Sequence, residues 1–414
     1  MGQGAVGRTA QQTPTLCRVY RRAYSLLIGT ALALWASTVF VSIKYDLPPI
    51  EPEGKLLGPS LSWALETLDA VPSSIVVLNV VMVVDVCLRA LTVLIAAVAV
   101  DLVVGTILTK RGELFRRGDE GSEESPLAKL RAGALDRWRT RWTRERARLV
   151  AVGMLFFYLT YVCYRNLKSD LPFVRPDPHR EPGSVKALSY DRELHVMDRV
   201  LFFGNDPSDV LHTVLGTTVT AHVLSQIYLT YLPLVILLVV VWLVWSRNVS
   251  FGYWFVTSQV VAWTLGTASY YLLPTLGPGI EYASEYEGLS HTPTTDLMVS
   301  ITYGRAGVLY DSTVEGALNS VAGFASLHVT ITVLWALMVQ YTVRSRILKW
   351  IFWVNAGLTV VATIYFGWHY VADDMAGIAI AIFSFYVGGI ASGQKFDRGM
   401  KSHPTTTTSK VPKD

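Results

Sequence analysis

His369 and Asp373, near the C-terminal end of the sequence, have the types and spacing needed for nucleophilic chemistry. They are four residues apart, so at the start of a helix they lie on one face, one turn apart. A carboxylate there can hold one imidazole nitrogen as N–H and leave the other nitrogen free as a nucleophile. The same spacing fits a structural hydrogen bond at a helix start, so the pair alone leaves both interpretations open.

A second histidine, His328, follows Ser326 at the beginning of another apolar run. Two histidines, a serine and an aspartate at neighbouring helix starts can supply a nucleophile and a general acid. The free N–H groups and positive dipole ends of helix N-termini suit a phosphate. This set of residues therefore indicates phosphoryl chemistry.

The segments that must position these side chains are long and apolar. The chain has 414 residues, of which 51% are hydrophobic and only 16% charged, whereas soluble domains carry about 25% charged residues. A membrane-spanning helix needs about 20 mostly apolar residues. The sequence predicts an all-α integral membrane protein with about eight spans, at residues 23–43, 86–108, 149–164, 224–245, 254–273, 324–341, 350–366 and 371–391.

Lys and Arg are concentrated in alternate connections between these runs, and such connections face the cytoplasm. We therefore expect an integral protein of the plasma (cell) membrane with both termini in the cytoplasm. His328 and His369 would then lie on the outer face. The net charge of +4 reflects this bias, so no nucleic-acid partner is expected. The Arg-rich stretch with Trp138 and Trp142 is interpreted as a helix lying on the membrane surface.

The chain is expected to divide into four parts. Residues 1–109 hold two N-terminal spans, and residues 110–148 form a basic cytoplasmic linker. Residues 149–391 form a six-helix catalytic core, and residues 392–414, which include four consecutive threonines, form a disordered cytoplasmic tail. The three cysteines are scattered, and no Asp, Glu and His cluster has the spacing of a dinuclear metal site. No metal and no cofactor are therefore predicted.

Two segments give the sequence a family resemblance. Residues 325–328 (Ala-Ser-Leu-His) and 369–373 (His-Tyr-Val-Ala-Asp) resemble the second and third motifs of the type-2 phosphatidic acid phosphatase (PAP2) superfamily. The resemblance implies a six-helix PAP2-type core preceded by two additional spans. It also implies that His369 attacks phosphorus, Asp373 orients it and His328 protonates the leaving oxygen. Ser326 stands where the family has a serine that contacts the phosphate.

The motifs depart from the common phosphatase form. Ala325 and Leu327 replace a proline and a glycine, and Ala362 and Thr363 occupy positions where the third motif often has Ser-Arg. A Pro-Thr-x-x-Pro turn at 274–278 resembles the inositolphosphotransferase branch, which includes inositol phosphorylceramide synthases. Other cations must then neutralise the phosphate, and the candidates are Arg165, Lys168 and Arg305. Each of these could instead be an interfacial anchor.

The predicted function is that of a membrane lipid-phosphate phosphotransferase. It would act through a phosphohistidine intermediate at the outer membrane face, with an alcohol or sugar as acceptor. A phosphatase that hydrolyses a prenyl or glycerolipid phosphate is the first alternative. A non-catalytic lipid-binding protein or scramblase is the second. The expected partners are the bilayer and a lipid phosphate substrate.

Overall fold

The computed structural model describes residues 13–49, 75–114, 125–179, 187–310, 323–396 and 402–404. The predicted all-α fold is confirmed over these residues, apart from one small sheet. The long helices are α1 (Thr13–Tyr45), α3 (Ile75–Leu114), α5 (Arg144–Val174), α8 (Val219–Trp245), α9 (Val249–Leu272), α12 (Leu327–Thr342), α13 (Arg346–Tyr365) and α14 (Val371–Ala391). Shorter helices are α4 (Pro126–Arg141), α6 (Asp191–Leu201), α7 (Pro207–Leu215), α10 (Pro278–Glu281), the 3-10 helix η1 (Ala283–Tyr286) and α11 (Pro293–Tyr310).

Six helices of the described chain are long and apolar enough to cross a membrane, and they are α1, α3, α5, α8, α13 and α14. The sequence predicted about eight, because the runs that became α9 and α12 were counted as well. α12 is too short at 16 residues. α9 carries polar side chains such as Thr257, Ser258 and Gln259, all fully buried. A helix surrounded by other helices need not present an apolar surface to lipid, which explains this difference.

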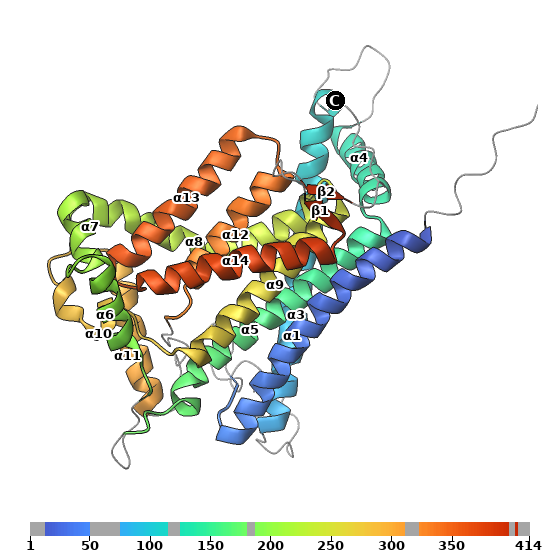
Figure 1. Ribbon diagram of the computed structural model, residues 1–414. Coiled ribbons are helices and arrows are strands. Elements are labelled where there is room, and N and C mark those ends of the chain that lie inside the picture. The colour runs from blue at the N-terminus through green and yellow to red at the C-terminus, as the bar shows by residue number, and fades with distance from the viewer. Residues whose placement is uncertain are drawn as a thin grey trace, which may run out of the picture.

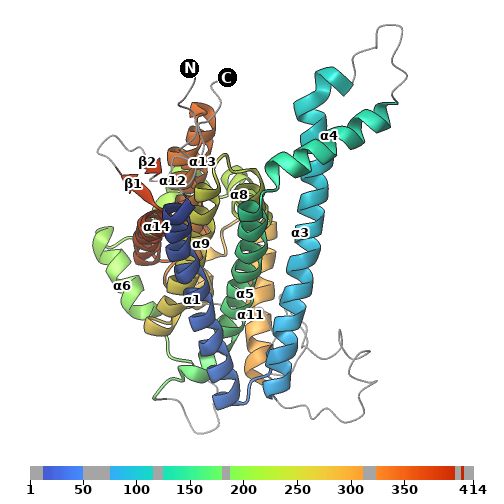
Figure 2. The same ribbon diagram turned by 90° about the vertical axis from the view of Figure 1, so that its right-hand side faces the viewer.

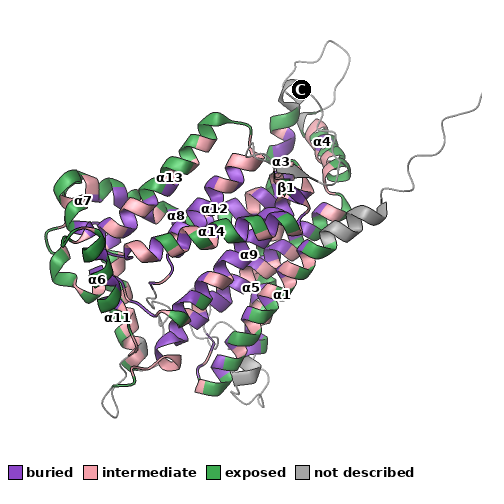
Figure 3. Cartoon of the chain, viewed as in Figure 1, coloured by how far each residue is buried: buried purple, intermediate pink, exposed green. Residues whose placement is uncertain are grey.

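α9 lies at the centre of the helical bundle and packs against α1, α5, α8, α12 and α14. Its large side chains, including Tyr253, Trp254 and Phe255, are fully buried. Figure 3 shows the contrast between the buried interior and the exposed outer faces of helices such as α13 and α14. These outer faces carry exposed apolar side chains, for example Trp350 and Phe383, as expected of a surface that meets lipid.

A cap of short helices covers one end of the bundle. α6, α7, α10 and α11 gather there, at the left in Figure 1, whereas α4 lies near the opposite end. His212 of α7 contacts the carbonyl oxygen of Tyr365 at 2.8 Å, and the Tyr365 hydroxyl donates to the carbonyl of Gly216. These bonds join the cap to the C-terminal end of α13.

α3 and α4 stand at one side of the bundle, as Figure 2 shows. The side chain of Asp101 on α3 is fully buried and lies 2.6 Å from the Arg137 guanidinium of α4. It also accepts hydrogen bonds from the indole N–H groups of Trp142 and Trp245. Several cationic and indole groups of the basic linker pair inside the protein, because a buried carboxylate needs partners. The membrane-surface helix expected for this stretch stays a prediction.

Two expected boundaries differ in the structure. The third span was predicted to end at residue 164, but α5 continues to Val174, with Leu167 and Leu171 buried. In the segment 392–414, expected to be disordered, Gln394–Phe396 (β1) pairs antiparallel with Ser402–Pro404 (β2). The ring of Phe396 packs against those of Trp254 and Phe385, which anchors β1 to the bundle.

Candidate active site

The third motif forms the start of α14. Tyr370 is the N-cap residue, and its backbone N–H donates to Oδ2 of Asp373 at 3.0 Å. The same carboxylate oxygen lies 3.4 Å from Nδ1 of His369. Asp373 is fully buried and His369 is 7% exposed. A carboxylate on Nδ1 orients the imidazole so that Nε2 is the nitrogen available for reaction.

The second motif forms the start of α12 and touches the third. Ser326 is the N-cap of α12, and its side chain accepts a hydrogen bond from the Val329 N–H. Its backbone N–H donates to the carbonyl oxygen of Asp373 at 3.0 Å. One turn later, the Thr330 hydroxyl donates to the carbonyl of Gly377 on α14. One backbone–backbone hydrogen bond and one bond from the Thr330 hydroxyl therefore fix the two predicted motifs against each other.

Aromatic rings from α8 hold the imidazole of His328. The Tyr228 ring is stacked on it at 4.4 Å between centroids, and the Tyr231 ring lies at 4.2 Å with a 38° tilt. Trp368, next to His369, stacks on Tyr228 at 5.4 Å. Nε2 of His328 is buried and has no hydrogen-bond partner among the described residues. The ring is thus held by packing, and this nitrogen has no protein partner there to fix its proton.

One cavity of about 190 Å³ brings four of the predicted residues together. His328, His369, Arg165 and Lys168 all line it. The remaining wall is mostly aromatic and aliphatic, formed by Tyr161, Tyr164, Tyr228, Tyr231, Leu232, Val235, Ile236, Trp263, Tyr270, Leu297, Ile301, Leu327 and Trp368. Two imidazoles and two cations beside an apolar wall suit a lipid that carries a phosphate group.

Three predicted residues do not line this cavity. Asp373 contacts His369, and Ser326 caps α12, so both support the two histidines. Arg305 lies on α11, where burial lowers the pKa of its guanidinium and the charge of Asp191 partly offsets that effect. Arg305 is therefore not among the residues that line the cavity with Arg165 and Lys168.

Asp191 is a residue of this region that the sequence analysis missed. Its carboxylate accepts hydrogen bonds from the Leu276 and Gly277 N–H groups and, at 3.0 Å, from the Tyr370 hydroxyl. It is 1% exposed. It joins the beginning of α6 to the turn after α9 and to the beginning of α14. No local pattern could have revealed this, because the partners are about 85 and 179 positions away in the chain.

Comparison with known families decides what kind of domain these elements form. Residues 192–387 match the model of the PAP2 superfamily. Residues 192–387 form a domain of the PAP2 superfamily. The match extends from α6 to α14 and includes both motifs, and PAP2 domains are typically phosphatases or phosphotransferases. It supports the superfamily and does not select the inositolphosphotransferase branch.

No curated protein and no solved structure matches the chain. The PAP2 match begins inside α6, so α5, expected as the first helix of the core, lies outside it. α5 nevertheless packs against α9 and α8 and supplies Arg165 and Lys168 to the cavity.

The Pro-Thr-x-x-Pro turn positions the His369 segment of the PAP2 domain. Gly277 and Gly367 have φ of 92° and 70°, a backbone region that favours glycine. The Gly279 N–H donates to the Gly367 carbonyl at 2.7 Å. A Cβ at Gly277 would come within 2.4 Å of the Trp368 carbonyl oxygen. The turn therefore packs directly against Gly367 and Trp368, the residues that precede His369.

At the position where the PAP2 third motif often has arginine, this domain has Thr363. Its hydroxyl donates to Oδ2 of Asp374 at 2.9 Å, and its carbonyl oxygen accepts from the Trp368 and His369 N–H groups. Thr363 thus organises the loop that leads to His369. Positive charge at the cavity comes instead from α5.

α6 also contacts the start of α14 through Asp198, which accepts a hydrogen bond from the Val371 N–H at 3.0 Å. Burial raises the pKa of the Asp198 carboxyl to about 6, and the Val371 hydrogen bond partly opposes this shift. One turn earlier, His195 lies with Asp206 and Glu285, and their potential ligand atoms are within 4.8 Å of one another. The sequence predicted no metal site, because these three residues are far apart in the chain.

Proposed function

We propose that the PAP2 domain transfers a phosphoryl-containing group from a membrane lipid phosphate to an alcohol through a phosphohistidine intermediate on His369. The observation that carries this proposal is the shared cavity, in which His369, His328, Arg165 and Lys168 face the same space. An isolated structural His–Asp hydrogen bond would not require a second imidazole and two cations at the same place.

In the first step, Nε2 of His369 forms a bond to phosphorus while the bond from phosphorus to the leaving oxygen breaks. His328 gives its proton to that oxygen. Asp373 stabilises the positive charge that develops on the His369 ring, as a buried carboxylate does for an imidazole in other covalent mechanisms. Arg165 and Lys168 neutralise the phosphoryl oxygens.

In the second step, an acceptor hydroxyl attacks phosphorus, and His328, now neutral, takes its proton. The N–P bond to His369 breaks, and the enzyme returns to its starting state. With an alcohol as acceptor the reaction is transfer, and with water it is hydrolysis. The replaced residues of the second motif and the Pro-Thr-x-x-Pro turn favour transfer, while a lipid phosphate phosphatase is the alternative.

The apolar part of the cavity wall indicates how the lipid lies. Leu232 and Ile236 line the cavity and are also exposed on the outer face of α8, by 51% and 44%. An acyl or prenyl chain can therefore extend from the cavity along α8 into the bilayer. We place the cavity at the outer membrane face because the basic connections lie at the other end of the predicted spans.

The test uses purified full-length protein in detergent with ³²P-labelled lipid phosphates, with and without an added alcohol such as inositol. We expect label on the alcohol, and label on the protein that survives alkali but is lost in acid. His369→Ala should abolish both signals, and His328→Ala should lower turnover by about a hundredfold or more. His222→Ala, which changes an exposed histidine of α8, is the matched control and should behave as wild type.

Label that appears only as free phosphate would replace the transferase by the phosphatase. Equal turnover in His369→Ala and wild type would refute the histidine mechanism. The protein could also bind lipid without turnover, equally in wild type and in both histidine variants. That result would support the hypothesis of a non-catalytic lipid-binding protein or scramblase.

A further inference from the structure

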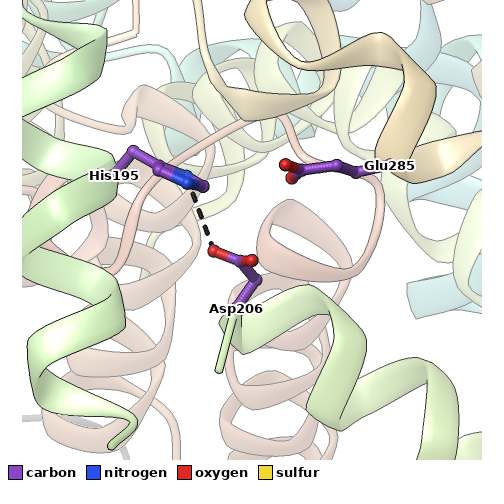
Figure 4. Close-up of side chains that lie close together, drawn as sticks. All are labelled: His195, Asp206 and Glu285. Atoms are coloured by element: carbon purple, nitrogen blue, oxygen red, sulfur yellow. Dashed lines mark ion pairs between the residues drawn. The ribbon is translucent and has the colours of Figure 1, made fainter. Parts of the chain in front are cut away.

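Three side chains from separate elements of the cap converge on one point. His195 lies on α6, Asp206 is the N-cap residue of α7 and Glu285 lies on η1. Nδ1 of His195 is 3.5 Å from Oδ1 of Asp206. The carboxylate of Glu285, on η1, points towards both side chains (Figure 4). The potential ligand atoms of all three lie within 4.8 Å of one another. One imidazole and two carboxylates make a ligand set typical of a divalent metal ion.

A second observation points to a missing positive partner. Asp198, one turn after His195, is 3% exposed, and its Oδ1 has no hydrogen-bond partner among the described residues. Oδ1 of Asp206 is likewise buried without such a partner. A buried carboxylate oxygen without a hydrogen bond is costly, and the 3.5 Å contact of Asp206 Oδ1 with His195 is no hydrogen bond, so a cation or a water would satisfy both oxygens.

These groups share one small pocket. His195, Asp198, Asp206 and Glu285 line it, together with His369. Its volume is about 10 Å³, which is close to the space that a single water or ion occupies. Glu285 is exposed, so an ion can enter from solvent and be closed in by that side chain.

The charges around the pocket are mainly negative. Asp209 adds a further carboxylate near Glu285. The nearby Arg199 directs its guanidinium to the carbonyl oxygen of Gly204. His195 is a further basic group near Glu285, and its ring packs on that of Tyr282 with 4.3 Å between centroids. Four carboxylates with so little positive charge favour a bound cation.

We propose that His195, Asp206 and Glu285 bind a single divalent transition-metal ion such as Zn²⁺ or Mn²⁺. Imidazole and carboxylate together suit these ions better than Mg²⁺, which prefers oxygen ligands alone. Three protein ligands leave at least one coordination position for a water molecule. This water can donate a hydrogen bond to Asp198. The ion connects α6, α7 and η1. Because His369 lines the same pocket, the ion holds these cap elements in place next to His369. It takes no part in the bond-making steps proposed above.

The test measures binding and does not depend on turnover. Full-length protein in detergent is stripped with a chelator, which is then removed, and Mn²⁺ is titrated while free Mn²⁺ is followed by electron paramagnetic resonance. We expect one ion per chain and a loss of affinity of at least about tenfold in His195→Ala and in Glu285→Gln. Because Glu285 is exposed, Glu285→Gln should leave the fold intact even where His195→Ala does not.

The matched control is His291→Ala. His291 and Asp296 also form a histidine–aspartate pair, at 3.1 Å, but it is exposed and is not part of a three-residue group. His291→Ala should bind Mn²⁺ as wild type does. Zn²⁺ should raise the unfolding temperature of wild type and of His291→Ala, but not that of Glu285→Gln. Absence of binding in the wild type, or equal binding in Glu285→Gln, would overturn the proposal. Neither result would bear on the phosphohistidine reaction, which is scored by label transfer.

Discussion

The hydroxyl group of Tyr370 donates a 3.0 Å hydrogen bond to Oδ1 of Asp191, which ties the start of α6 to the residue that follows His369. The same carboxylate receives the Leu276 and Gly277 N–H groups of the turn after α9. One buried side chain thus holds three segments of the candidate active site together. We therefore expect the geometry of His369 to depend on Asp191, which takes no part in the proposed chemistry.

Asp191→Ala should therefore destabilise the protein and lower its activity together. The change leaves two backbone N–H groups and the hydroxyls of Ser189 and Tyr370 without their acceptor, at a cost of about 2–4 kcal/mol. The measurement is the apparent unfolding temperature in detergent, combined with phosphoryl transfer. Tyr370→Phe is the control, because it removes one of these donors and should have a clearly smaller effect. An unfolding temperature equal to that of wild type in Asp191→Ala would contradict this role.

Tyr228 stacks between His328 and Trp368, so its ring should set the position of the general acid. Tyr228→Leu is expected to lower kcat by about 10- to 100-fold, since small misplacements of a reacting group are expensive. Tyr228→Phe keeps the ring and should stay close to wild type. The comparison is made by steady-state kinetics over a range of pH. If Phe and Leu at this position were equally impaired, the hydroxyl rather than the stacking would be responsible.

Burial raises the pKa of Asp198 to about 6, so the folded protein binds this proton more tightly than the unfolded chain does. The free energy of unfolding should consequently fall as pH rises from about 4, the ordinary aspartate value, towards 6, and then level off. Asp198→Asn keeps an acceptor for the Val371 N–H but cannot lose a proton. In a chelator, its unfolding temperature should decline less between these pH values than that of wild type.

The control for this pH effect is Asp209→Asn, on an exposed position of α7. Its pH profile should follow the wild type. A decline of equal size in Asp198→Asn and wild type would assign the effect to another group.

Asp101 is a buried carboxylate that pairs with Arg137 and two indole N–H groups. Asp101→Ala leaves the Arg137 charge without its partner, and removal of one member of a buried pair costs about 3–5 kcal/mol. We expect a large fall in the unfolding temperature. Asp85→Ala is the matched control, since the Asp85–Arg89 pair of the same helix is partly exposed and should contribute less than about 1 kcal/mol. Similar losses in both variants would argue against a special role for Asp101.

The helical class, the apolar runs and the two motifs were readable from the sequence because each depends on local order. A run of about 20 apolar residues indicates a helix in lipid whatever its neighbours are. His369 and Asp373 are four residues apart, so helix geometry alone brings them together. Among the described residues, fewer helices than predicted are long and apolar enough to cross a membrane, because burial among other helices determines the composition of α9.

The composition of the site was decided by tertiary structure. Arg165 and Lys168 share a cavity with His328 and His369 because α5 packs against α8 and α9, whereas Arg305, equally basic in the sequence, does not reach it. Asp191 and the group of His195, Asp206 and Glu285 gave no local signal, since their partners come from distant segments. Sequence by itself determined which elements form and which residues share one helix turn. Packing between helices decided which charges meet, because contacts across a fold depend on the whole chain.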